Sequence, residues 1–212
     1  MKPSYEDCVF INCPFDTDYK PIFEVLVFTV FDAGFYPRCA LEVSDGAQNR
    51  LDKIMTIISE CKYGVHDISR TEPDPLHNLP RFNMPFELGL YFGCKRFGTK
   101  KQRTKVCLVM DRERFRYQRF ISDIAGTDIT EHNDEREIAS RRMRNWLRTT
   151  SRRSTVPGPQ RIWNRFNEFQ GQLPTICGNL GIDLDEIPFV EYCHLISEWL
   201  KLNALPVVRI TT

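Results

Sequence analysis

Short apolar runs alternate with longer segments of helical spacing along the first 150 residues. β-rich runs at residues 8–13, 35–41, 63–68 and 106–110 predict four strands. Apolar residues recur at helical intervals in residues 19–33, 48–61, 83–93 and 134–147, and more weakly in 114–121. Strands and helices that alternate in this way predict an α/β fold with a doubly wound, flavodoxin-like, mostly parallel sheet and helices on both faces.

The composition changes at residues 151–159, where Ser, Arg, Pro and Gly predominate. We therefore predict an α/β domain in residues 1–150 and a helical C-terminal extension in residues 151–212, with helices near 160–180 and 188–202. The predicted helix at 19–33 is apolar nearly all round, so either the extension or a second copy of the chain must cover it. For this reason we expect a homo-oligomer, at least a dimer, and we consider the C-terminal helices a possible surface for a protein partner.

The most informative stretch is the predicted helix at residues 83–93, which carries Glu87. Asn83 is a suitable N-cap, and Glu87 follows in or just past the first turn among apolar neighbours. A carboxylate there feels the positive end of the helix, so we expect it to stay ionised while largely dry. Tyr91, four residues on, should share its face. The face expected to lie close against the sheet comprises Phe86, Gly89, Leu90 and Gly93. The alternative is an ordinary first-turn glutamate that faces water.

Charge and cysteine usage narrow the function classes. The net charge of +1 does not indicate a polyanion partner. Asp111 and Glu113 interrupt the basic cluster at 95–119, and we interpret this cluster and the one at 141–153 as solvated faces, so nucleic acid is not expected. Eight scattered cysteines without a Cys-x-x-Cys pair predict free thiols, with neither a disulfide framework nor a metal site. The N-terminal residues lack the apolar run of a signal peptide, and no stretch has the length of a membrane span. These features predict a cytoplasmic protein without a membrane partner.

Polar residues at the predicted carboxyl ends of strands are candidates for ligand contacts. Asn12 and the loop at residues 14–16 could hold a phosphate or ribose, or form a plain turn capped by Asp16. Asp67 and Ser69 could contact ribose hydroxyls or cap the next loop. Three arginines could pair with a pyrophosphate or lie on the surface: Arg38, Arg50 and Arg81.

Four motifs occur in order along the chain: Phe10-Ile11-Asn12-Cys13-Pro14-Phe15-Asp16, Asp67-Ile68-Ser69, Arg81-Phe82-Asn83-Met84-Pro85-Phe86-Glu87-Leu88-Gly89 and Ser122-Asp123-Ile124-Ala125-Gly126. Together they resemble the superfamily that joins TIR-like nucleotide-binding domains to nucleoside 2-deoxyribosyltransferases. The resemblance covers roughly residues 8–147, and Pro85 with Phe86 departs from the two small or aliphatic residues frequent in relatives.

The resemblance implies cleavage of an N-glycosidic bond with Glu87 as the catalytic residue, as in NAD glycohydrolases and ADP-ribose cyclases of bacterial antiviral defence. NAD would be the substrate, and no cofactor is implied. Nicotinamide leaves as a neutral molecule, whereas a purine would need a proton, for which Asp67 or His66 is the nearest candidate. The alternatives are a non-catalytic nucleotide-binding module and a deoxyribosyltransferase or nucleoside hydrolase. The substrate-binding candidates are Asn12, Pro14, Phe15, Asp16, Arg38, Asp67, Ser69, Arg81, Asn83 and Tyr91.

Overall fold

The computed structural model describes residues 3–42, 45–73 and 78–204. Its centre is a sheet of five parallel strands in the order β2-β1-β3-β4-β5. This is the flavodoxin-like order, so the predicted α/β doubly wound class is confirmed. The strands are β1 (Cys8–Asn12), β2 (Tyr36–Arg38), β3 (Tyr63–Asp67), β4 (Val106–Asp111) and β5 (Ile129–Glu131). The sequence pattern missed β5.

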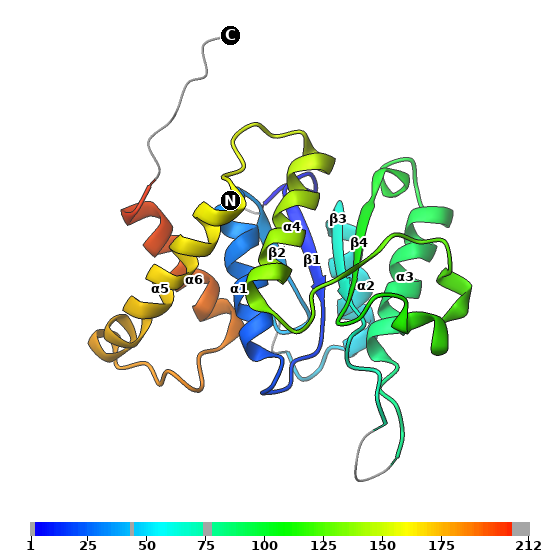
Figure 1. The fold of residues 1–212 in the computed structure, drawn as a ribbon, viewed down its shortest axis with the longest axis horizontal. Helices are drawn as coiled ribbons and strands as arrows, with labels where there is room; N and C mark the ends of the chain where they lie inside the picture. The colour runs from blue at the N-terminus through cyan, green and yellow to red at the C-terminus, as the bar shows by residue number, and fades with distance from the viewer. Residues whose placement is uncertain (1–2, 43–44, 74–77, 205–212) are drawn as a thin grey trace.

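Helices cover both faces of the sheet (Figure 1). One face carries α1 (Lys20–Asp32) and α4 (Arg136–Ser151), and the other carries α2 (Arg50–Glu60) and α3 (Asn83–Phe97). Alternation along β1 explains the two layers, because Val9 and Ile11 join the core under α1 whereas Cys8 and Phe10 join the core under α2.

The C-terminal helices α5 (Pro159–Leu180) and α6 (Phe189–Leu202) form a further layer outside α1 (Figure 1). Phe28 of α1 lies 5.6 Å from both Phe166 and Phe169 and 6.0 Å from Trp199, measured between ring centroids. The C-terminal extension is therefore what covers the apolar helix, and this helix does not require a second copy of the chain.

Helix α3 presents a different face to the sheet from the one predicted. Met84, Glu87, Leu88 and Tyr91 are buried, whereas Gly89 is exposed. The close approach is made by a glycine on the strand instead. A Cβ on Gly64 of β3 would lie 2.6 Å from the Tyr91 ring.

Two further expectations about local structure were wrong. The residue that precedes α3 is Phe82, and the helix begins at Asn83, so Asn83 is not the N-cap. Residues 114–121 contain only a short 3₁₀ helix, η2 (Arg116–Arg119), near two others, η1 (Gln102–Thr104) and η3 (Ser122–Ile124). All eight cysteines are unpaired thiols. Within the described residues, no helix is both long enough and apolar enough to span a membrane.

Candidate functional site

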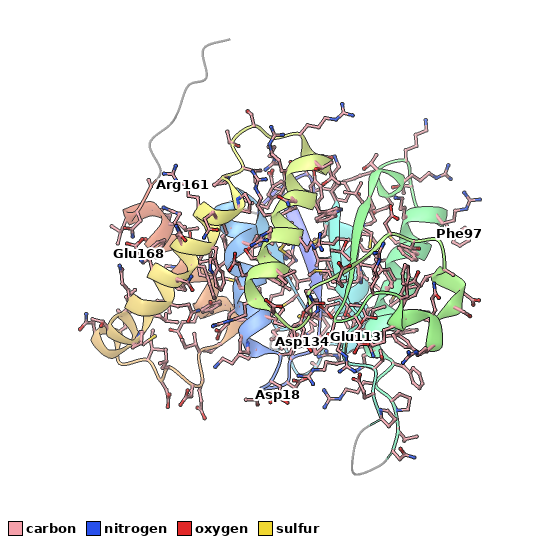
Figure 2. All side chains as sticks on the ribbon, in the orientation of Figure 1. Asp18, Phe97, Glu113, Asp134, Arg161 and Glu168 are labelled. Atoms are coloured by element: carbon pink, nitrogen blue, oxygen red, sulfur yellow. The ribbon has the colours of Figure 1, made fainter. Side chains whose placement is uncertain are left out.

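The carboxyl ends of the strands meet at one end of the molecule. In a sheet of this order the chain leaves in opposite directions after β1 and β3, and ligands bind in the crevice that results. Asp18, Glu113 and Asp134 follow β1, β4 and β5 in the chain, and Figure 2 labels them at this same end. The candidate residues must therefore be judged by their position relative to this edge.

Glu87 is buried near this edge, with only 7 % of its surface exposed. It is the fifth residue of α3 and lies beyond the first-turn amides that lack helical partners, since the Phe86 amide already donates to the Phe82 carbonyl at 2.9 Å. The helix end therefore gives its charge little support. Burial raises the pKa of Glu87 to about 7, and the positive charge of Arg50 offsets this only in part. Glu87 is therefore largely dry, as expected, but its raised pKa leaves the carboxyl only partly ionised at neutral pH. Glu87 exchanges its proton close to neutral pH.

Asn12 fixes the helix that carries Glu87. Its side-chain amide donates to the Met84 carbonyl at 2.9 Å and lies 3.0 Å from His66 Nδ1. An amide N–H can only donate, so His66 Nδ1 accepts and the ring proton sits on Nε2. Asn12 thus connects β1, β3 and the first turn of α3, and it is nearly fully buried. In this arrangement it acts as a positioning residue, and its burial leaves its side chain almost no surface for a ligand.

His66 is not a proton donor for a leaving group. Burial, with a smaller contribution from the charge on Lys105, lowers the pKa of His66 to about 3. Its ring packs edge-on against Tyr91, with centroids 4.9 Å apart, on the inner side of α3. The neutral imidazole is part of the core.

Asp67 is fully buried, and both of its carboxylate oxygens are occupied. The Tyr19 hydroxyl donates to Oδ2 at 2.7 Å, His132 Nε2 lies 2.9 Å from the same oxygen, and the Ser69 amide donates to Oδ1 at 2.9 Å. Burial raises the pKa of Asp67, but these contacts outweigh it and the net pKa is lowered. The carboxylate therefore caps the next loop, as the alternative interpretation held, and offers nothing to a ribose.

His132 is the buried partner that the sequence did not reveal. The Asp134 amide donates to His132 Nδ1 at 3.1 Å, so a neutral ring carries its proton on Nε2, the nitrogen 2.9 Å from Asp67 Oδ2. Burial lowers the pKa of His132, but Asp67 more than compensates, so the pKa is raised overall. The two residues are 65 positions apart, Asp67 at the end of β3 and His132 directly after β5, so no local spacing could have predicted the pair.

An arginine-lined cavity of about 490 Å³ opens at this edge beside the loop after β1. Arg81 Nη1 lies 3.5 Å from Asp16 Oδ2, and Arg70 Nη2 lies 3.9 Å from Asp16 Oδ1. Arg112 Nη2 lies 2.5 Å from Glu72 Oε1. Only Arg81 and Asp16 were predicted from the sequence. Three guanidinium groups on one cavity can accept a phosphate or pyrophosphate in exchange for their carboxylate partners.

Arg116 stabilises the loop that forms part of the wall of the arginine-lined cavity. Its guanidinium donates to the Ile68 and Ser69 carbonyls at 2.8 Å and to the Thr71 hydroxyl at 3.1 Å. It also donates to Asp111 Oδ1 at 2.8 Å. A single buried side chain therefore joins the loop after β3 to the end of β4.

The loop after β1 forms a turn capped by Asp16, which is the simpler of the two interpretations of the sequence. Asp16 Oδ1 accepts from the Tyr19 amide at 3.0 Å, so Asp16 caps the turn while its other oxygen faces Arg81. Pro14 is buried, and Phe15 is exposed over 37 % of its surface. Asp16 and Phe15 are therefore accessible to a ligand, and Pro14 shapes the turn.

Three other candidates do not line the arginine-lined cavity. The Tyr91 hydroxyl lies 2.8 Å from both the Lys62 and the Val106 carbonyl, at the amino end of the sheet, and can donate its single proton to either. Arg38 is held by Glu42 at 2.5 Å and by Glu60 at 3.0 Å. Ser69 is fully buried, and its hydroxyl has no partner among the described residues. Asn83, by contrast, is exposed at the start of α3.

No family model matches this chain, and no curated protein matches it. Among the described residues, no group of three or more His, Cys, Asp or Glu side chains is arranged to hold a metal ion. The geometry of the site is thus the basis for a functional proposal.

Proposed function

We propose that the protein cleaves the N-glycosidic bond of NAD, with Glu87 as the catalytic residue. The observation that supports this best is a buried carboxylate with a pKa near 7 on the helix that opens beside the β1 and β3 edge. Perturbed carboxylates beside a cleft are typical of catalytic sites. Arg81, two residues before the same helix, lines the cavity suited to a pyrophosphate. The motifs around Glu87 add the resemblance to TIR-like NAD glycohydrolases, and with it a role in bacterial antiviral defence.

The chemistry needs one carboxylate. When the bond between C1′ and the nicotinamide nitrogen breaks, its electron pair leaves with the nitrogen, and positive charge develops on the ribose. Ionised Glu87 would stabilise this cation or trap it as an ester, and water would then add to C1′ to give ADP-ribose and a proton. If a hydroxyl of the adenosine half replaced water, the product would be cyclic.

The environment of the other titratable groups favours NAD over a purine nucleoside. Nicotinamide leaves NAD as a neutral molecule and needs no proton, whereas a purine does. Asp67 is held as an anion by its partners, and His66 accepts a hydrogen bond from Asn12 with its pKa near 3. Neither of the two residues expected to protonate a purine is suited to do so.

Release of nicotinamide from NAD tests the proposal. The purified protein should release nicotinamide over a range of protein concentrations, and Glu87→Gln should abolish release while it keeps the size of the side chain. Glu113→Gln is the matched control, since Glu113 is an exposed glutamate at the same end of the molecule (Figure 2). Wild-type protein that releases no nicotinamide at any concentration would refute the proposal.

The second candidate is a non-catalytic nucleotide-binding module. It is favoured by one observation, which is that Glu87 does not line the arginine-lined cavity. Calorimetry that detects tight nucleotide binding without any product would support it. A deoxyribosyltransferase or nucleoside hydrolase would instead exchange or release bases from nucleosides, and it would need the acid that Asp67 and His66 do not supply.

A further inference from the structure

A second cavity lies on the other side of the loop after β1. It has a volume of about 300 Å³, and its walls come from that loop, from α1 and from the connection that leads into α6. The C-terminal layer therefore contributes directly to a hollow at the carboxyl end of the sheet.

Aromatic side chains form the floor of this cavity. Phe15 meets Phe23 edge to face, with ring centroids 5.3 Å apart, and Phe23 lies 5.8 Å from Phe189 of α6. Phe15 is 37 % exposed, so a ligand can reach its ring. Such walls favour a flat ring, and the volume is at the lower end for small-molecule sites.

Carboxylates line the same cavity as the aromatic rings. Asp16, Glu24, Asp185 and Glu186 line the cavity together with one lysine, Lys20, whose ammonium donates to the Asp185 carbonyl at 3.1 Å. Carboxylates accept hydrogen bonds from amino and hydroxyl groups, and they repel phosphate. The cavity thus fits the base and ribose of a nucleoside and excludes its phosphates.

The two cavities share a wall made of Asp16 and Thr17. A ligand that crosses this wall meets carboxylates and aromatic rings on one side. On the other side it meets three arginines paired with Asp16, Asp18 and Glu72, which a phosphate would replace as ion-pair partners. We infer that the aromatic cavity binds the adenosine half of a dinucleotide while the arginine-lined cavity binds its pyrophosphate. This inference rests on the proposed function, and it gives the C-terminal helical layer a role in substrate selection.

Ile187→Trp tests the inference by filling the cavity. Ile187 is a half-buried lining residue in the connection between α5 and α6. Calorimetry with ADP-ribose should show affinity weakened about tenfold or more, a loss typical of a displaced base. Nicotinamide mononucleotide, which lacks the adenosine half, should bind as it does to wild type. Ile182→Trp is the matched control, because Ile182 is also half-buried in this connection but does not line the cavity.

Phe15→Leu provides a second test that does not depend on accommodating a larger side chain. It removes the exposed ring while the site stays apolar, and it should weaken ADP-ribose binding selectively in the same way. Equal ADP-ribose affinity in wild type and both variants would overturn the inference, as would wild type that binds no ADP-ribose at millimolar concentration.

The inference and the proposed function fail in different ways. If Glu87-dependent release of nicotinamide is intact but Ile187→Trp leaves the KM for NAD unchanged, the adenosine site is wrong and the enzymatic proposal stands. If ADP-ribose binding depends on the cavity but no nicotinamide is released, the adenosine site stands and the enzymatic proposal fails.

Discussion

The protonation of Glu87 depends on where this residue lies along helix α3. A glutamate in the first turn would lie beside free backbone amides that stabilise its charge. Glu87 lies past them, after Phe86, whose amide is already bonded within the helix, and the packing of α3 against the sheet removes most of the contact of Glu87 with water. Burial therefore prevails, and it raises the pKa of Glu87 to about 7.

The activity should depend on pH through Glu87. Only the ionised form can stabilise a ribosyl cation, so kcat/KM for NAD should rise through an apparent pKa of about 7 and level off above it. A profile of nicotinamide release between pH 5 and 9 measures this. Activity that is flat across this range would show that Glu87 does not titrate in the step observed.

Glu87→Gln should stabilise the fold at high pH. The folded protein holds the Glu87 proton more tightly than the unfolded chain, so this contribution to stability is complete below pH 4.5 and is lost as the pH rises to about 7. The loss is up to about 3 kcal/mol. The gain in Tm on substitution should thus be larger at pH 8 than at pH 5. An equal effect at both pH values would contradict the raised pKa.

The pair of Asp67 and His132 should contribute to stability rather than to substrate binding. His132→Ala leaves the buried Asp67 carboxylate without its main partner, which should cost about 3–5 kcal/mol. Urea denaturation measures the change, with Glu113→Gln as an exposed control. A loss below about 1 kcal/mol would show that Tyr19 and the Ser69 amide suffice.

At the scale of elements, α1 is apolar all round because helices contact it on several sides. The large side chains of α1 meet α4 on one side and α5 and α6 on another. The sequence predicted both the composition and the need for a cover, but it could not tell the C-terminal extension from a second copy. Long-range packing made that choice.

Phe169→Ala in α5 should destabilise the whole protein. The Phe169 ring is fully buried against Phe28 and Trp199, and its removal should cost about 3–5 kcal/mol. Phe97, which is 83 % exposed at the end of α3 (Figure 2), is the control, and its replacement by alanine should change stability by less than about 0.5 kcal/mol. Chemical denaturation of the full chain measures both.

The sequence predicted elements well where periodicity was strong. Four strands, four helices of the α/β core and both C-terminal helices were predicted at their observed places in the chain, although β2 is shorter than the predicted run at 35–41 and both α3 and α4 end four residues later than predicted. β5 was missed because three half-buried residues carry no clear alternation. The face of α3 was misjudged because the glycine that allows close contact, Gly64, lies on the opposing strand. Glu87 was proposed from its motif. The parallel topology, which the local sequence does not show, brings Arg70 and Arg112 to one cavity and His132 to Asp67.

At the scale of the whole molecule, a homo-oligomer was expected because the apolar helix α1 needs a cover. The protein's own C-terminal layer covers α1, so this reason no longer applies. Some apolar side chains on α2 and α3 stay exposed, and they lie on a different surface from the covered face of α1. Leu51, Met55 and Phe86 are 38 %, 42 % and 54 % exposed.

The wall of Asp16 and Thr17 between the two cavities has a consequence for affinity. A dinucleotide held on both sides of this wall binds through two linked groups. Once one half is bound, the other half has an effective concentration at its own site of about the millimolar range. Adenosine and inorganic pyrophosphate, offered as separate fragments, would each lack this advantage. Discrimination between whole dinucleotides and their breakdown products would then arise from the spacing of two modest sites, with neither of them selective alone.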